Sequence, residues 1–169
     1  MLIVRREKPE DFDAIRKVNE KAFGQTAEAN LTDALRAHGK ALLSLVVCEG
    51  DEVVGHILFS PVTIESDRGA FPAVGLAPMS VLPELQRQGI GSLLVRAGLD
   101  ECRRRNYDCV VVLGHPEYYP RFGFEPASNY SIKSEYDAPD EAFMIIQLRE
   151  GALAGRAGIA KYQPEFDEV

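Results

Sequence analysis

Hydrophobic residues near the N-terminus are spaced first as in a strand and then as in helices. A short apolar run over residues 2–6 precedes a segment with apolar residues every three or four positions, which predicts a first helix over residues 9–23. Pro9 suits the first turn of that helix, because proline lacks the amide hydrogen that the turn leaves unbonded. Thr26 is a candidate cap for a second helix, and Gly39 marks its end.

The next stretch predicts an antiparallel meander. Residues 42–49 and 53–60 are rich in leucine, valine and other bulky apolar types, and residues 50–52 between them have turn chemistry. A second turn at residues 66–69 returns the chain through a third strand over residues 71–81. These strands are therefore expected to pair in sequence order.

Helical spacing returns over residues 89–105, with apolar residues on one face and charged residues on the other. The run over residues 109–113 is wholly apolar and is typical of a central parallel strand buried on both faces. A strand, a crossover helix and a parallel strand make a βαβ unit. A late strand is expected over residues 143–148, while the polar, proline-containing residues 127–142 predict a long surface loop.

Length and composition bound the class of protein. A chain of 169 residues with 46% hydrophobic content is expected to form one domain over residues 1–169 and to bury a substantial core. No run approaches the roughly 20 apolar residues that span a bilayer, and the N-terminus becomes charged too early for a signal peptide. We therefore expect a cytoplasmic protein that does not bind membranes.

Charge and cysteine content argue against other classes. A formal net charge of −7 argues against nucleic-acid binding, which needs a basic surface, and weakly favours a basic acceptor. An acidic balance also serves solubility alone. The three cysteines, Cys48, Cys102 and Cys109, form no C-x-x-C pair, so we expect neither a disulfide framework nor a metal site. Cys48 and Cys109 lie in apolar runs, as small core residues do.

A glycine-containing segment stands between the third meander strand and the next helix; it consists of Gln86, Arg87, Gln88, Gly89, Ile90, Gly91 and Ser92. At a helix start, unpaired amides and the positive end of the dipole accept an anion, and glycine lets a phosphate approach the backbone. Leu94 stands where a dinucleotide-binding fingerprint needs a third glycine, and the Gly-Lys-Ser/Thr ending of a P-loop is absent. Taken alone, these glycines fit a purely structural turn equally well.

An aromatic segment follows the apolar run at residues 109–113 and contains Tyr118, Tyr119, Phe122 and Phe124. Aromatic residues at this density pack against each other more often than they catalyse. A tyrosine just after a parallel strand, however, lies at the carboxyl edge of the sheet, where open α/β sheets usually bind ligands.

Together the two segments resemble the GNAT superfamily of acyl-CoA-dependent N-acyltransferases, and in particular its bacterial YhbS-like branch. The pattern Gln-x-x-Gly-x-Gly beginning at Gln86 matches the family's pyrophosphate-binding motif, and Tyr-x-x-x-Gly-Phe beginning at Tyr119 matches its tyrosine signature. The agreement extends over residues 2–126. The resemblance implies a single α/β domain (α+β in some schemes), with a mixed, mostly antiparallel central sheet flanked by helices and a βαβ unit that carries the CoA site.

The resemblance also implies how the cosubstrate acetyl-CoA is held, with no metal involved. The backbone from Met79 to Val81 would pair with the pantetheine arm. The pyrophosphate would be held by Arg87, Gln88, Gly89, Gly91 and Ser92. Tyr119 would be the catalytic acid that donates its proton to the departing sulfur, while an amine attacks the thioester directly in a ternary complex.

The group that takes the proton of the amine is left open by the sequence. A lysine-like amine has a pKa near 10.4, so a base or a water path must deprotonate it at pH 7. Many relatives place a carboxylate on one of two central strands, but residues 77–80 and 110–113 contain none. His56, His115, Glu28 and a water path all stay candidates, and a structural role fits His56 better than a catalytic one.

Two classes of function stay open: an active N-acetyltransferase, and a non-catalytic acyl-CoA-binding sensor or interaction module. Tyr119 favours the enzyme, because a sensor needs the phosphate-binding segment but no proton donor. The open acceptors are a small-molecule amine, an antibiotic-like amine, an amino acid and a protein N-terminal amine. Acyl-chain length and oligomeric state, including a homodimer, are not readable from the sequence.

Overall fold

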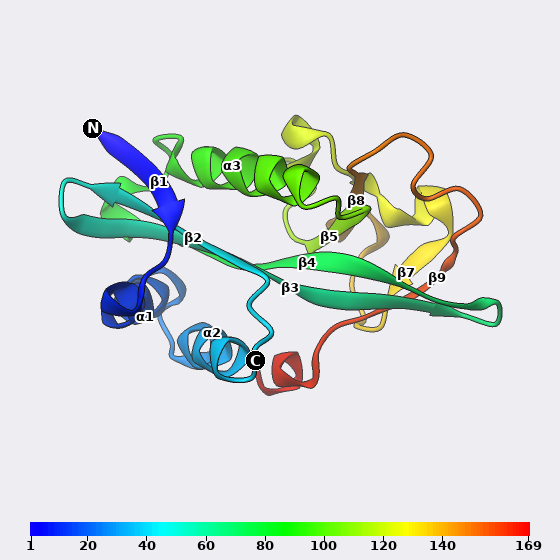
Figure 1. Ribbon diagram of the computed structural model, residues 1–169, viewed down its shortest axis with the longest axis horizontal. Helices are drawn as coiled ribbons and strands as arrows, with labels where there is room; N and C mark the ends of the chain where they lie inside the picture. Colours follow the sequence, from blue (N-terminus) through cyan, green and yellow to red (C-terminus); the bar gives the residue numbers. More distant parts are fainter. The chain divides into compact units, whose positions relative to one another are not determined.

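A computed structural model describes residues 1–169 of the chain (Figure 1) and divides into two units. Unit 1 comprises Met1–Ser60, Ala77–Gly98 and Pro164–Val169, and unit 2 comprises Pro61–Leu76 and Leu99–Gln163. The elements that run from one unit into the other are strands β3 (Glu52–Ser66) and β4 (Gly69–Val81) and helix α3 (Ile90–Arg104).

Unit 1 contains the predicted antiparallel strands. β1 (Leu2–Arg6) pairs with β2 (Leu43–Glu49), which pairs with the first part of β3 in a register that sets Val46 opposite His56. The turn between β2 and β3 is tight, and Gly50 there has a φ of 62°, which glycine adopts without strain. β4 follows β3 in the sheet, so the predicted meander is confirmed.

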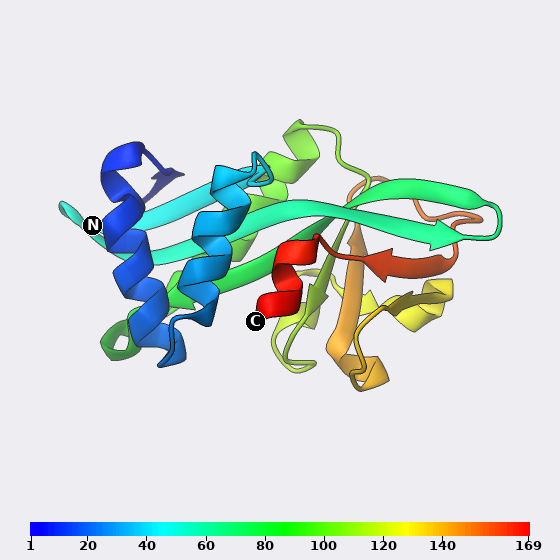
Figure 2. The same cartoon turned by 90° about the horizontal axis from the view of Figure 1, so that it is seen from below.

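Helices α1 (Phe12–Phe23) and α2 (Ala27–Ala37) lie side by side in unit 1 (Figure 2), which confirms both predicted helices. Leu31 and Leu35 share one face of α2 because they are four positions apart, and they pack on Leu58 of β3. This apolar contact holds α2 against the sheet.

The ends of these helices differ slightly from the prediction. The first turn of the first predicted helix is a 3-10 helix at Pro9–Asp11. Thr26 stands at the cap position of α2, but its side chain makes no capping hydrogen bond. At the other end, Gly39 has a φ of 71°, as expected where a helix terminates.

The opposite face of β3 packs on the part of α3 that belongs to unit 1. Successive strand residues point to opposite faces, so Phe59 points away from the face that Leu58 shares with α2. Gly98 of α3 makes room for the Phe59 ring, because a Cβ at position 98 would lie 2.5 Å from two of the ring carbons. A Cβ at Gly55 would likewise lie 3.2 Å from Cδ1 of Leu94. Close backbone approach at two glycines therefore sets the packing of α3 on β3.

Unit 2 contains the buried strand and the βαβ connection that the sequence predicts. β5 (Cys109–Leu113) runs parallel to β4, with Val74 opposite Val110, and its other edge pairs with antiparallel β8 (Phe143–Gln147). β6 (Glu125–Pro126) pairs with β8. The core of unit 2 includes Val62, Ile64, Ala73, Cys109, Val111, Phe143, Ile145 and Leu153.

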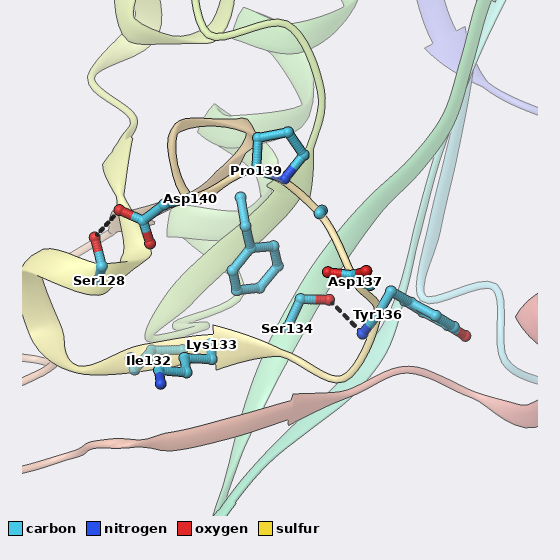
Figure 3. Close-up of a pocket in the computed structure, with 10 residues that line it drawn as sticks. Ser128, Ile132, Lys133, Ser134, Tyr136, Asp137, Pro139 and Asp140 are labelled. Atoms are coloured by element: carbon cyan, nitrogen blue, oxygen red, sulfur yellow. Dashed lines mark hydrogen bonds between the residues drawn. The ribbon is translucent and has the colours of Figure 1, made fainter.

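The expectation of a surface loop over residues 127–142 is wrong for residues 127–134, whereas residues 135–139 form neither helix nor strand (Figure 3). The segment forms a 3-10 helix at Ala127–Tyr130 and strand β7 (Ile132–Ser134), and Ile132 is only 1% exposed. β7 pairs in parallel with β9 (Gly158–Lys161), a strand that the sequence analysis missed. A 3-residue strand is too short for its hydrophobic period to be read, so the pairing partner decides its structure.

In hydrogen-bonded order the strands run β1-β2-β3-β4-β5-β8-β6, with β9 pairing β3 and β7. This mixed, mostly antiparallel sheet with flanking helices is the predicted fold class.

Short 3-10 helices lie at Pro9–Asp11, Pro83–Leu85, Tyr119–Phe122, Ala127–Tyr130, Asp140–Ala142 and Pro164–Glu168. None of the helices combines the length and apolar character needed to cross a membrane.

The three cysteines are free thiols in the protein interior. Cys48 is 6% exposed, and Cys102 and Cys109 are 0% exposed. Burial raises the pKa of the Cys102 and Cys109 thiols to about 12, so both stay protonated near neutral pH. The prediction that Cys48 and Cys109 act as small core residues is confirmed.

Candidate functional site

The glycine-containing segment of unit 1 connects the end of β4 to the start of α3. β4 ends at Val81, a 3-10 helix follows at Pro83–Leu85, and α3 begins at Ile90. Gln86 Nε2 donates a 3.0 Å hydrogen bond to the carbonyl of Val81. The motif glutamine therefore ties the segment to the end of the preceding strand.

The backbone of this segment favours an anion site. φ is 65° at Arg87 and 88° at Gly89, and the side chains of Arg87 and Gln88 are exposed, while Gly91 and Ser92 are half-buried in the first turn of α3. A side chain at position 89 would meet nothing within 4 Å, so the space there is open. The first amides of a helix lack intrahelical carbonyl partners, and the positive end of its dipole lies beside them. Open space, amide donors and positive charge are what a pyrophosphate needs.

The last residues of β4 alternate in direction. The Ser80 hydroxyl donates a 2.7 Å hydrogen bond to Oδ1 of Asn19 on α1, and Asn19 Nδ2 lies 3.5 Å from Oγ1 of Thr32 on α2. Ser80 therefore faces the α1 and α2 side of the strand. Because neighbouring strand residues point to opposite faces, Met79 and Val81 face the other side. Val81 is 8% exposed and Met79 is half-buried.

The sequence analysis missed the link between Asn19 and Ser80. Asn19 is 0% exposed and directly follows the buried Val18 on the apolar face of α1. A buried amide needs hydrogen-bond partners, so a polar residue on an apolar helix face indicates a polar group opposite. That signal was present in the sequence, but the identity of the partner was not.

His56 of β3 is 0% exposed and belongs to a chain of hydrogen bonds. Its Nε2 lies 2.8 Å from Oγ of Ser44, and that hydroxyl donates to Oε1 of Glu7 at 2.6 Å. Because the single proton of Ser44 goes to Glu7, His56 must donate from Nε2, which leaves Nδ1 unprotonated and without a partner. Burial lowers the pKa of His56 to about 4, so the imidazole is neutral at pH 7.

Glu7 is the anionic group in this series of hydrogen bonds. Arg36 of α2 donates from Nε and Nη2 to the two carboxylate oxygens of Glu7, each at 2.8 Å. Burial raises the pKa of Glu7, but hydrogen bonds from Arg36 and Ser44 outweigh this effect and hold the pKa below its usual value. The ionised carboxylate thus organises β1, β2, β3 and α2 around His56, which supports the structural interpretation of that histidine.

The other base candidates have less enclosed surroundings. Glu28 is half-buried in the first turn of α2, where Gln25 Nε2 donates to its two carboxylate oxygens at 3.0 and 3.1 Å. His115 of unit 2 is exposed after the end of β5. The described chain contains no group of three or more His, Cys, Asp or Glu side chains that could hold a metal ion.

Tyr119 lies in unit 2, at the start of a 3-10 helix that follows β5 (Tyr119–Phe122). Its ring is 7% exposed and packs edge-on against Tyr118 and Phe124, with ring centroids 5.1 and 5.6 Å apart. Burial raises the pKa of the Tyr119 phenol above its ordinary value. The hydroxyl therefore keeps its proton at neutral pH and is able to donate it.

Gly114 is a further residue of this segment that the sequence analysis did not single out for a role. A Cβ built at Gly114 would overlap Cε2 of the Tyr119 ring. Only glycine lets the ring lie so close to the backbone. At the other end, Gly123 ends the 3-10 helix with a φ of 104°, which explains the glycine of the Tyr-x-x-x-Gly-Phe pattern.

Comparisons with known proteins show the family of the chain. Residues 3–127 match the family model described as an acetyltransferase (GNAT) domain. The chain is also 34% identical to YhbS of Escherichia coli K12, which is named an uncharacterised N-acetyltransferase, over 98% of this chain and 99% of that protein.

Two crystal structures share the fold over nearly the whole chain. E. coli YhbS in complex with CoA superposes with a TM-score of 0.92 at 34% identity, covering 98% of this chain and 92% of that chain. A GNAT family acetyltransferase from Brucella melitensis in complex with acetyl-CoA gives a TM-score of 0.82 at 35% identity, covering 99% of each chain.

Proposed function

Because the chain belongs to the GNAT family of N-acetyltransferases, we propose that it transfers an acetyl group from acetyl-CoA to a primary amine. The observation that carries the proposal is the segment from Gln86 to Ser92, which brings an exposed arginine and the open space beside Gly89 to the start of α3. Two relatives, 34% and 35% identical over nearly the full chain, have been crystallised with CoA and acetyl-CoA, respectively. Their ligands support acetyl-CoA as the cosubstrate of this chain. Their coverage also supports one acetyltransferase domain over residues 1–169.

The binding roles follow from the unit 1 geometry. Arg87 offers a guanidinium, and the backbone of Gln88, Gly89, Gly91 and Ser92 offers amides at the positive end of the α3 dipole, so these residues would hold the pyrophosphate. The backbone of Met79 and Val81 would pair with the pantetheine arm as a strand pairs with a neighbouring chain. Acetyl-CoA supplies the acetyl group as a thioester, which an amine attacks directly in a ternary complex.

Two proton movements complete the reaction. Tyr119 Oη would give its proton to the sulfur of the leaving group, since the phenol is protonated at neutral pH. We propose that a water path removes the proton of the amine, because residues 77–80 of β4 and residues 110–113 of β5 include no carboxylate side chain. His56 is poorly suited as the base, since burial lowers its pKa to about 4 and its Nε2 already donates to Ser44.

The test is an acetyl-transfer assay with pools of primary amines, followed by free thiol release and by mass spectrometry of the products. Amine-dependent thiol release with a mass gain of one acetyl group on the amine is the expected result. Tight acetyl-CoA binding without transfer to any pool would instead identify a non-catalytic acyl-CoA sensor. A pool of peptides with free N-termini separates protein N-terminal acceptors from small amines.

A further inference from the structure

A buried chain of hydrogen bonds in unit 1 connects β4 to α1 and α2, the two helices on one face of its strands (Figure 1). Ser80 Oγ donates to Asn19 Oδ1 at 2.7 Å, and Asn19 Nδ2 donates to Thr32 Oγ1 at 3.5 Å. Thr32 Oγ1 in turn donates to the carbonyl of Glu28 at 2.9 Å. Both hydroxyl protons are used, so the chain runs in one direction from the strand to α2.

This chain of hydrogen bonds crosses an interface that is otherwise apolar. Asn19 and Thr32 are 0% and 1% exposed, and the residues that precede them, Val18 and Leu31, are 2% and 4% exposed. Water does not reach such a position, so a shift of β4 against the helices would leave a buried donor or acceptor unpaired. A satisfied buried network therefore specifies one arrangement of the elements that it joins.

The end of β4 has fewer strand contacts than the rest of the strand. The pairing of β4 with β5 extends only to Gly75, and residues 77–81 continue beyond it. Pro78 has no amide hydrogen to donate to a neighbouring strand. On the β3 side, the N–H of Leu82 donates a 2.9 Å hydrogen bond to the carbonyl of Val54. Hydrogen bonds from side chains therefore matter more for holding this end of the strand.

Ser80 lies between Met79 and Val81, whose backbone is proposed to pair with the pantetheine arm. Because the Ser80 side chain points to the helices, its bond to Asn19 holds the strand without using a backbone group of either neighbour. On the far side of Val81, Gln86 Nε2 donates to the Val81 carbonyl at 3.0 Å. Two side-chain hydrogen bonds thus restrain the strand end.

We propose that Asn19 is a positioning residue for the cosubstrate. Through Ser80 it keeps the backbone of residues 79–81 ordered before the pantetheine arm binds. A strand that is already ordered loses less conformational entropy when a ligand pairs with it, so the free energy of binding is more favourable. The inference rests on the proposed function, because it assumes that this strand end binds the cosubstrate. Asn19 itself does not touch the cosubstrate and acts through Ser80.

The first test compares CoA with 3′-phospho-ADP as ligands of the wild-type chain and of Ser80→Ala, by calorimetry. 3′-Phospho-ADP is CoA without its pantetheine arm, so it reports on the pyrophosphate-binding segment alone. Ser80→Ala should raise the Kd of CoA about three- to tenfold, the effect of one hydrogen bond, and leave the Kd of 3′-phospho-ADP unchanged. Equal weakening of both ligands would indicate a general structural role and overturn the proposal, as would unchanged CoA affinity.

Ser44→Ala is the matched control, because it removes the same hydroxyl from another buried serine of unit 1. The Ser44 hydroxyl bonds to Glu7 and His56, neither of which belongs to β4. This variant should therefore bind both ligands as the wild-type chain does, even if its Tm falls. An equal loss of CoA affinity in Ser44→Ala would show that lower stability alone weakens binding, and the proposal would fail.

The double variant Asn19→Leu/Ser80→Ala separates positioning from stability. It replaces both partners of the hydrogen bond with apolar groups, so neither is left unpaired and the Tm should stay near that of the wild-type chain. CoA binding should still weaken as much as in Ser80→Ala, because both changes remove the same restraint. Wild-type CoA affinity in the folded double variant would contradict the proposal. A loss beyond that of Ser80→Ala would also contradict it, since Asn19 would then act separately.

Binding without turnover separates this inference from the proposed reaction. Weaker CoA binding in Ser80→Ala, with no acetyl transfer by the wild-type chain to any amine, would support the positioning role and overturn the reaction. Acetyl transfer with the same acetyl-CoA KM in the wild-type chain and in Ser80→Ala would keep the reaction and overturn the positioning role. A wild-type chain that binds no CoA would overturn both.

Discussion

Gly114 lies directly beneath the ring of Tyr119, so closely that a Cβ at position 114 would overlap Cε2 of that ring. Both residues belong to the segment that follows β5 in unit 2. The contact explains how a short 3-10 helix holds a bulky aromatic side chain with only 7% of its surface exposed. The position of the Tyr119 hydroxyl therefore depends on the absence of a side chain five residues earlier.

Gly114→Ala should lower kcat although the hydroxyl of Tyr119 is retained. The added methyl group must displace the ring, and misplacement of a reacting group by about 1 Å can cost up to about 10²-fold. Steady-state assays of Gly114→Ala, Tyr119→Phe and the double variant provide the check. If the loss acts through Tyr119, the double variant should be no slower than Tyr119→Phe, whereas additive losses would point to a separate role for Gly114.

Tyr119→Phe removes one hydroxyl and should lower kcat while leaving CoA affinity nearly unchanged. General acids contribute about 10²- to 10⁴-fold, and the loss should fall in or just below that range because a thiol leaves tolerably without help. Tyr118→Phe is the built-in control, since the adjacent ring packs at 86° to that of Tyr119. Equal losses from both variants would indicate packing, and a fully active Tyr119→Phe enzyme would exclude the proton-donor role.

Gly91→Asp should weaken CoA binding by more than about tenfold, because it adds a negative charge at the start of α3 beside the proposed pyrophosphate site. Gly91→Ala, which adds a methyl group without charge, distinguishes electrostatic from steric loss. Calorimetry with CoA measures both, and thermal unfolding shows whether each variant is folded. Wild-type affinity in a folded Gly91→Asp protein would remove this segment from the cosubstrate site.

Stability should fall as pH drops from about 6.5 to about 4 because of His56. The pKa of about 4 in the folded protein lies below the unfolded value near 6.5, so the unfolded chain binds the proton first and becomes favoured. The full contribution of neutral His56 to the free energy of unfolding is present above about pH 6.5. The loss of that contribution approaches about 3 kcal/mol near pH 4. Urea unfolding at a series of pH values measures it.

His56→Gln keeps an amide donor for Ser44 without a titrating group. The difference in unfolding free energy between wild type and this variant should therefore change with pH. His38→Gln is the control, because the His38 side chain is 59% exposed and pairs with Glu165. An identical pH dependence in wild type and His56→Gln would show that His56 is not the titrating group.

Most of the architecture could be predicted from local sequence patterns. Helical spacing marked α1 and α2, apolar runs flanking turn residues marked β2 and β3, and the wholly apolar run at 109–113 marked a parallel strand. These signals are local because the order of residues within a helix or strand determines which of its sides is apolar and packs on the core. For the same reason the glycines of the segment before α3 and the tyrosine after β5 were found as motifs, although their roles stay proposals.

Contacts between distant residues were decided only by the tertiary structure. Ile132 is buried because β9 pairs with β7, and that partner lies more than twenty residues further along the chain. The hydrogen bond from Ser44 to Glu7 decides which ring nitrogen of His56 carries the proton, and the neighbours of His56 in sequence do not reveal either partner. Gly114 matters because of where the ring of Tyr119 lies. A sequence pattern specifies which faces are apolar, whereas the partner that satisfies each buried polar group or fills each space is set by how the whole chain packs.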